Sequence, residues 1–360
     1  MPYGLFCACV LAWGRLKRAP ERHQSGTAVI DWVTALIPYH GPHQITGGQV
    51  VSIDQDGVIE WSCQKRLSVE GSYSSKIQVR SEPGDFLWIS GNPSKFLQGH
   101  NLFGSNDLVT LMSVFLSAVS EAMGLDPTPE DVGKWDRGRY RLSRVDVAEC
   151  FRLPSTQHVD NWLRAASPLV RGKHQGVSAY NGETIYVGQK SRRIALKIYN
   201  KARELRKHKL SDDIPCRRRL NEYAEGLLRV EVRLLSLELK KRKLHGARWW
   251  SPKACQELIQ ERIGRLEMPK KLRLTATEIS ELPPRLVGAV KLWESGADLR
   301  AIYPKATFYR YRTELRRFDI DILAPPKTET NVVPLVTYLE AEHQATVPDW
   351  AAKAGLLACA

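Results

Sequence analysis

The sequence has no run of about 20 apolar residues, which is the length that a membrane-spanning helix needs, so we expect no membrane partner. Its seven cysteines are scattered, and no two of them form a C-x-x-C pair. We therefore expect neither a disulfide framework nor a structural zinc site, and we expect the chain to work in a reducing cytoplasm. Nothing in the chain looks like a nucleotide-binding loop, because the pattern G-x-x-x-x-G-K-[ST] is missing.

Acidic residues are too few to balance the basic ones. The 360 residues include 53 Lys and Arg against 39 Asp and Glu, which gives a net charge of +14. Such an excess favours a polyanionic partner, and nucleic acid is the first candidate. Ribosome-associated and RNA-processing proteins have similar compositions, so charge alone does not decide the function. A hydrophobic content of 43% is enough to bury a sizeable core.

The first 28 residues differ from the rest of the chain. Residues 5–13 are apolar, but the basic residues Arg15, Lys17 and Arg18 follow them. A secretory signal has its positive region first, so we do not expect one here. We expect a leader of uncertain order, and a mis-started N-terminus is the simplest interpretation.

Alternating and helical spacings predict several elements of a mixed fold. Short strands are expected at residues 32–37, 77–79 and 86–90. Cap and stop signals predict one helix from Ser105 or Asn106 to Gly124, a second from about Ser155, and a third from Ser251-Pro252 to about Leu266. No internal repeat is visible.

Three further strand candidates have unusual polar faces. They cover residues 141–150, 194–201 and 228–234, and in each one apolar residues alternate with polar ones. The polar sets are Arg144 and Asp146; Lys197, Tyr199 and Lys201; and Arg229, Glu231 and Arg233. If the three strands lie in one sheet, Asp146, Glu231 and Tyr199 converge in one patch with a basic rim.

Such a patch could cut a phosphodiester. Two carboxylates on a rigid sheet suit Mg²⁺ or Mn²⁺, and a tyrosine beside them supplies a nucleophile that stays on the enzyme. Lys197 and Lys201 are expected to favour the phenolate of Tyr199 through nearby positive charge. The alternative is ordinary: a strand tyrosine that packs, and strand acids that form surface ion pairs.

Several motifs agree in order with a known family. The stretches GNPSKFLQGHNLFG (91–104), SRVDVAEC, YNGETIYVGQKSRRIALKIYNKARE (180–204) and LLRVEVRL resemble the replication proteins of filamentous phages, the gene II/X type. The resemblance covers roughly residues 29–325. It implies an α+β fold with an antiparallel relaxase-like sheet that carries helices on one face, and a domain that nicks one strand at an origin through a tyrosine and a divalent metal.

The resemblance also implies roles for individual residues. Tyr199 is the expected nucleophile, and Asp146 and Glu231 are the expected metal ligands. Glu149 has the opposite strand parity from Asp146, so it is a weaker candidate ligand that needs a bulge or a strand end to re-aim it. The chain has no His-hydrophobic-His pair; for the lone His100 a structural role is expected. Tyr186 and Tyr180 are rival nucleophiles.

Basic stretches supply the expected DNA contacts. Residues 201–220 contain eight Lys and Arg, and Lys240–Lys243 adds a cluster; both suit phosphates, although a solvated helical face is the alternative. Residues 285–318 have the spacing of a helix-turn-helix, whose third helix buries Phe308, Tyr311, Leu315 and Phe318. A helical hairpin that only packs on a neighbour looks similar. The expected DNA-binding side chains are Arg144, Arg229 and Arg233 on the sheet, and Tyr309, Arg310, Thr313, Arg316 and Arg317 on this module.

These observations divide the chain into a leader (1–28), a nicking domain (29–270), a helix-turn-helix-like module (271–325) and a poorly ordered tail (326–360). We expect a rolling-circle initiator that nicks and rejoins DNA through a 5′-phosphotyrosine, with a host helicase and DNA polymerase as partners. Two alternatives remain open: a non-catalytic DNA-binding regulator of replication, and a metal-dependent nuclease without a covalent intermediate. A tyrosine recombinase is disfavoured, since no Arg…His-x-x-Arg…Tyr constellation is present.

Overall fold

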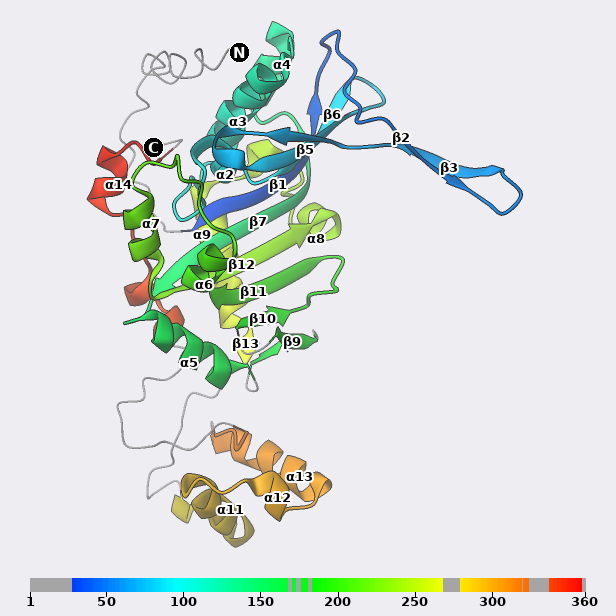
Figure 1. Cartoon of the computed structure of the whole chain (residues 1–360). Helices are drawn as coiled ribbons and strands as arrows, with labels where there is room; N and C mark the ends of the chain where they lie inside the picture. Colours follow the sequence, from blue (N-terminus) through cyan, green and yellow to red (C-terminus); the bar gives the residue numbers. More distant parts are fainter. Residues whose placement is uncertain are drawn as a thin grey trace.

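A computed structural model describes residues 28–167, 170–172, 176–180, 183–267, 279–318, 320–323 and 337–357. Its centre is a nine-stranded antiparallel sheet with the order β4-β5-β6-β1-β7-β12-β11-β10-β9 (Figure 1). The expected α+β fold with an antiparallel sheet is confirmed. The leader at 1–27 and the linkers at 268–278 and 324–336 lie outside the described residues.

The strands of the main sheet are β1 (Val29–Pro38), β4 (Leu67–Glu70), β5 (Lys76–Glu82), β6 (Phe86–Gly91), β7 (Arg141–Arg152), β9 (Val177–Tyr180), β10 (Thr184–Val187), β11 (Ile194–Asn200) and β12 (Leu227–Leu235). Two small two-stranded sheets pair β2 (Gln49–Ile53) with β3 (Ile59–Gln64), and β8 (Arg171–Gly172) with β13 (Leu266–Glu267). All the strands that the sequence predicted are present.

The α-helices are α2 (Pro93–Gln98), α3 (Leu108–Met123), α4 (Pro129–Asp136), α5 (Thr156–Ala166), α6 (Lys201–Lys207), α7 (Arg217–Ala224), α8 (Ser236–Lys241), α9 (Pro252–Gly264), α11 (Pro284–Glu294), α12 (Leu299–Ile302), α13 (Lys305–Leu315) and α14 (Asp349–Lys353). Short 3-10 turns are η2 (Ser72–Ser74), η3 (Ala247–Trp249), η4 (Arg316–Phe318), η5 (Thr337–Leu339) and η6 (Ala341–His343).

Local sequence explains where the three predicted helices begin. The side chains of Ser155 and Ser251 accept hydrogen bonds from the first turns of α5 and α9, so both predicted caps are confirmed. The cap of α3 is Asp107 rather than Ser105 or Asn106, because Asp107 accepts from the amide of Thr110. Within the described part of the chain, no helix is long and apolar enough to cross a membrane.

The main core lies between the apolar face of the sheet and the helices α3, α5 and α9. Val145, Val147, Val230 and Val232 from β7 and β12 are fully buried in it. A smaller cluster joins α6, α7 and α14 to Cys150, which points to the opposite, polar side of the sheet. The helices α6, α7 and α14 therefore cover the polar side of the sheet near Cys150. The candidate site lies on the same side, next to these helices.

The C-terminal helices form a small module with a core of its own. Leu286, Val290 and Trp293 of α11 pack with Phe308 and Leu315 of α13, as the helical spacing predicted. The predicted helical module is confirmed, and its boundaries stay a prediction.

The expectation of a poorly ordered tail is wrong for residues 337–357. The amide of Ala345 donates to the carbonyl of Cys150 at 2.8 Å, and Leu339 is buried in the main core. Leu356 is buried in the smaller cluster. The sequence did not show this because the segment is short and mixed in character, and only tertiary packing orders it.

The β2–β3 hairpin projects from the main sheet (Figure 1). It was not predicted. Its apolar residues Val50, Ile53, Ile59 and Trp61 are all exposed, so they contribute nothing to the core.

Candidate active site on the polar face of the sheet

The three strands with unusual polar faces are neighbours in the sheet, in the order β7-β12-β11. Their registers place Tyr199 opposite Arg229, Lys197 opposite Glu231, and Arg233 opposite Asp146. Side chains directly opposite one another share a face, so the alternation read from the sequence predicted the polar face correctly.

Tyr199 of β11 lies on this face and is only 4% exposed. Its hydroxyl donates a 2.6 Å hydrogen bond to Oε1 of Glu231. Burial, together with the negative charge of Glu231, raises the pKa of the Tyr199 phenol well above its ordinary value. The phenol is therefore neutral in this structure, and the Glu231 carboxylate is in position to accept its proton.

The two lysines do not flank Tyr199 as predicted. Lys197 does lie beside it, with Nζ 3.9 Å from the centre of the phenol ring and 3.9 Å from Oε2 of Glu231. Lys201 begins α6 instead, where its ammonium donates to Oδ1 of Asn101 at 2.8 Å and to Glu204 at 2.6 Å. The prediction that the lysine pair lowers the pKa of Tyr199 is wrong, because burial dominates and the strand ends before Lys201.

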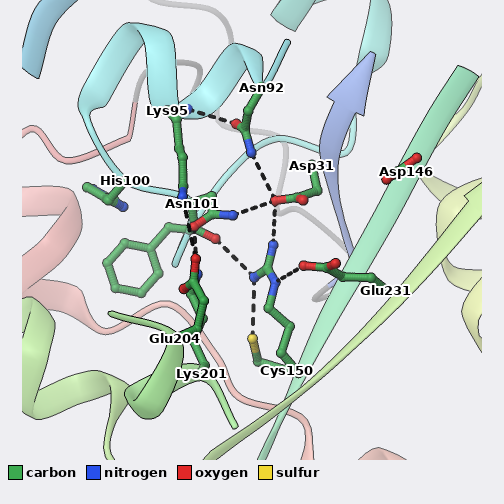
Figure 2. A network of polar contacts seen from close by, with 12 residues as sticks. Asp31, Asn92, Lys95, His100, Asn101, Asp146, Cys150, Lys201, Glu204 and Glu231 are labelled. Carbon is green, nitrogen blue, oxygen red and sulfur yellow. Dashed lines mark hydrogen bonds and ion pairs between the residues drawn. The ribbon is translucent and has the colours of Figure 1, made fainter. Parts of the chain in front are cut away.

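Arg229 is fully buried, so the prediction that it contacts DNA is wrong. Its guanidinium donates to Glu231 at 3.1 Å and to Asp31 at 2.7 Å (Figure 2). It also donates to the backbone carbonyl of Asn101 at 3.0 Å. Arg229 thus joins β12 to β1 and fixes the carboxylate that receives the Tyr199 hydrogen bond.

Asp31 is a site residue that the sequence analysis missed. It lies at a bulge in β1, where the pairing with β7 shifts between Ile30 and Trp32. Burial disfavours its charged form, but Arg229 and Lys201 hold the pKa of Asp31 below its ordinary value. An aspartate inside the apolar run VIDWVTALIP was the available signal, since a buried strand carboxylate needs a partner.

Two amides complete the surroundings of Asp31. The side chains of Asn92 and Asn101 donate to its Oδ1 at 3.1 and 2.6 Å (Figure 2). Both come from the GNPSKFLQGHNLFG stretch, which connects β6 to α3 through α2. The same stretch supplies Lys95, whose ammonium is 3.7 Å from Glu204.

Asp146 stands apart from this network (Figure 2). Its carboxylate pairs with Arg144 and, at 3.3 Å, with Arg233. Burial raises the pKa of Asp146 although both arginines oppose the shift. Each of the two predicted metal ligands is thus neutralised by arginine.

Glu149 lies on the apolar side of the sheet, opposite Val230, and Gln256 of α9 donates to its Oε1 at 3.2 Å. Its assignment to the metal site is wrong, because the β7–β12 register has no bulge that re-aims it. Among the residues that the structure describes, no group of three or more His, Cys, Asp and Glu is placed to hold a metal ion. As arranged, these carboxylates do not fit a preformed metal site.

The remaining candidates have ordinary surroundings. Tyr186 of β10 lies opposite Lys197 of β11 and is half-buried. The side chain of Tyr180 is outside the described residues. His100 is fully buried and packs in a T-shaped arrangement with Phe103, which agrees with the structural role expected of it.

The predicted DNA-binding side chains of the helical module are exposed: Tyr309, Arg310, Thr313, Arg316 and Arg317. Arg312, between them in sequence, is buried and pairs with Asp321. The exposed set therefore forms an outer face on α13 and η4, and its contact with DNA stays a prediction.

Comparison with known proteins shows what the chain is similar to. Residues 29–253 match the family described as "Replication-associated protein G2P N-terminal", and residues 287–357 match "Replication-associated protein G2P C-terminal". The "Replication-associated protein G2P" of Enterobacteria phage I2-2 is 35% identical over 332 residues, which cover 89% of this chain and 95% of that protein.

The solved structure of a rolling-circle replication initiator protein from Geobacillus stearothermophilus is 12% identical in sequence, with a TM-score of 0.29. The match covers 73% of this chain and 96% of the Geobacillus chain. A score this low does not bear on the fold. The two family matches are in the same order as the sheet domain and the helical module, and the phage protein matches almost from end to end. The chain belongs to the G2P family of phage replication-associated proteins.

Proposed function

We propose that this chain starts rolling-circle replication by cutting one DNA strand at an origin, with Tyr199 as the nucleophile. The observation that carries the proposal is the 2.6 Å hydrogen bond from the Tyr199 hydroxyl to Glu231. A tyrosine with a raised pKa is a poor nucleophile unless a base removes its proton, and Glu231 is the adjacent base. Membership of the G2P family supports a role in replication.

In the proposed step, the Tyr199 oxygen attacks the phosphorus of a phosphodiester while Glu231 takes the phenolic proton. The bond from phosphorus to the 3′ oxygen breaks, and that oxygen leaves as a hydroxyl after it receives a proton from Glu231 or water. The products are a 5′-phosphotyrosine and a free 3′ hydroxyl. The reverse reaction rejoins the strand, because the bond to Tyr199 replaces the one that was broken.

Neighbouring side chains prepare this step. Arg229 holds the Glu231 carboxylate in place, and Asp31 holds Arg229. Lys197 adds a positive charge beside the ring and the carboxylate, where negative charge develops on the phosphate. Positioning of this kind works best on rigid strands, and β11 and β12 are interior strands that are paired on both sides.

Mg²⁺ or Mn²⁺ stays our proposal for the cofactor, on the strength of the family resemblance. When bound, such an ion polarises a phosphodiester and stabilises the departing oxygen. The described carboxylates, paired with arginines, do not fit a preformed ion site, so the step above uses side chains of this chain alone.

Origin recognition is assigned to the outer face of α13, which would fix the protein on duplex DNA near the cut. A free 3′ hydroxyl primes synthesis, so we propose a host helicase and DNA polymerase as partners in the cytoplasm of the host cell.

The proposal is tested by incubating the protein with origin DNA and Mg²⁺ and running a denaturing gel. A band of DNA with protein attached is expected for the wild-type chain and not for Tyr199→Phe. Cleavage without attached protein would indicate a nuclease that lacks a covalent intermediate. Binding without cleavage, unchanged by Tyr199→Phe, would indicate a regulator.

A further inference from the structure

The polar face of the sheet extends beyond the candidate active site toward β6 and β5, and aromatic side chains lie along this extension. Trp32 of β1 and Trp88 of β6 are half-buried on it. Trp32 is fixed by a 3.1 Å hydrogen bond from its indole to Ser90. Both indoles are thus partly accessible and belong to paired strands of the main sheet.

Each of these indoles is covered by arginine. The guanidinium carbon of Arg144 is 4.9 Å from the ring centre of Trp32. Those of Arg66 and Arg80 are 4.4 and 5.5 Å from the ring centre of Trp88. A guanidinium stacked on an aromatic face occupies the place that a nucleic-acid base can take, and it can then pair with the adjacent phosphate.

The pairing registers place both tryptophans on the same face as Tyr199. Trp32 lies opposite Asp146, which lies opposite Arg233, so this row continues from β1 through β7 to β12. Trp88 lies opposite Leu36 and Arg80, so its row continues from β1 through β6 to β5. Four strand spacings separate β11 from β6, which is roughly 19 Å at about 4.8 Å per strand.

The charge along this path is positive. Its cations are Arg66, Arg80, Arg141, Arg144, Arg229, Arg233 and Lys197, and its acids are Asp31, Glu82, Asp146 and Glu231. Aromatic faces interleaved with cations on a rigid support are the features that bind single-stranded nucleic acid.

We propose that the face formed by Trp32, Trp88 and their stacked arginines binds single-stranded DNA and leads it to Tyr199. This inference rests on the proposed function, since it names where the unpaired strand next to the cut is held. The bases stack on the two indoles, and the arginines move from the rings to the phosphates. A duplex keeps its bases paired and stacked inside, so it cannot use this face in the same way.

The test measures binding of a fluorescein-labelled oligo(dT) of about 15 nucleotides by anisotropy, with the full-length protein. Trp88→Leu is expected to weaken binding about 10-fold, because loss of one base–aromatic stack costs on this order. Trp88→Phe keeps an aromatic face and is expected to restore most of the affinity. Trp32→Leu should act as Trp88→Leu does, and circular dichroism confirms that each variant is folded.

A matched control comes from elsewhere in the fold. Trp249 is 58% exposed and has Arg248 stacked 4.5 Å from its ring centre, but it belongs to η3 and not to the sheet. Trp249→Leu is expected to leave oligo(dT) affinity unchanged. An equal loss with Trp249→Leu, or displacement of the oligonucleotide by duplex DNA as readily as by unlabelled oligo(dT), would overturn the proposal.

The readouts separate this inference from the proposed function. If the wild-type chain forms no adduct with origin DNA but Trp88→Leu weakens oligo(dT) binding, the binding face stands and Tyr199 chemistry fails. If adducts form and folded Trp32→Leu and Trp88→Leu bind oligo(dT) as the wild type does, the binding face is refuted and the nicking proposal stands.

Discussion

The hydroxyl of Tyr199 on β11 donates a 2.6 Å hydrogen bond to the carboxylate of Glu231 on the adjacent strand β12. The bond runs diagonally, because the residue directly opposite Tyr199 is Arg229. Arg229 in turn binds both Glu231 and Asp31. One chain of contacts therefore links the proposed nucleophile to a buried ion pair.

The first prediction concerns the nucleophile. Tyr199→Phe should abolish the covalent adduct with origin DNA and leave DNA binding unchanged, because only the hydroxyl is removed. Loss of the hydrogen bond to Glu231 should cost about 1 kcal/mol of unfolding free energy. The adduct is measured on a denaturing gel and binding by a mobility shift. Tyr186→Phe, on the neighbouring strand, is the control that should still form the adduct; its failure to do so would move the nucleophile to β10.

The second prediction concerns the buried arginine. Arg229→Met removes the buried guanidinium that Asp31 and Glu231 share, so we expect a loss of about 3–5 kcal/mol in unfolding free energy by urea titration. Arg233→Met is the control on the same strand. Its side chain is 40% exposed, and we expect a change below about 1 kcal/mol. Equal, small effects of the two variants would show that Arg229 does not organise the site.

The third prediction is an acid-sensitive stability that depends on His100. Burial, helped by the charge of Lys201, lowers the pKa of His100 to about 4 from an ordinary value near 6.5. Since the unfolded chain takes up the proton at a higher pH than the folded one, stability is lost as the pH falls from about 6.5 to about 4. The total loss is on the order of 3 kcal/mol.

Urea unfolding of the wild type and His100→Asn at several pH values measures this loss. The variant should lack this part of the pH dependence, whereas His208→Asn, at an exposed position, should keep it. Parallel pH curves for the wild type and His100→Asn would contradict the prediction.

The fourth prediction separates two arginines of α13. Arg310→Ala removes an exposed cation, so origin-duplex binding should weaken and the slope of log affinity against log salt should fall by about 1. Arg312→Ala instead removes the guanidinium that pairs with the buried Asp321 at 2.5 Å and leaves it with Arg316 at 3.9 Å, so it should unfold the helical module. Binding across a salt series and circular dichroism measure the two effects. A folded Arg310→Ala variant with an unchanged salt slope would remove this face from DNA recognition.

The sequence predicted the strands of the site well because their alternation is local. Residues 141–150, 194–201 and 228–234 show a clear period of two, and this is enough to place Asp146, Tyr199 and Glu231 on the polar sides of their strands. That the three strands lie in one sheet was only a condition of the prediction, and the structure shows that they are neighbours in it.

What the sequence could not show depends on long-range contacts. Asp31 is 198 positions from Arg229, and no spacing rule connects them. Arg229 alternates like a surface residue, but the 99–106 loop and β1 bury it. Lys201 is two positions after Tyr199, so strand alternation predicts that both side chains share a face. The strand β11 ends at Asn200, however, and Lys201 is the first residue of the helix α6. Residues 337–357 pack on the sheet domain, and no local sequence pattern predicts this packing either.

The most direct test is to identify the residue that becomes attached to DNA. The wild-type chain is reacted with origin DNA, digested with protease and nuclease, and the nucleotide-linked peptide is sequenced by mass spectrometry. We expect one modified residue, Tyr199, in the peptide that contains IALKIYN. A nucleotide on Tyr186, on Tyr180 or on any residue other than Tyr199 would contradict it.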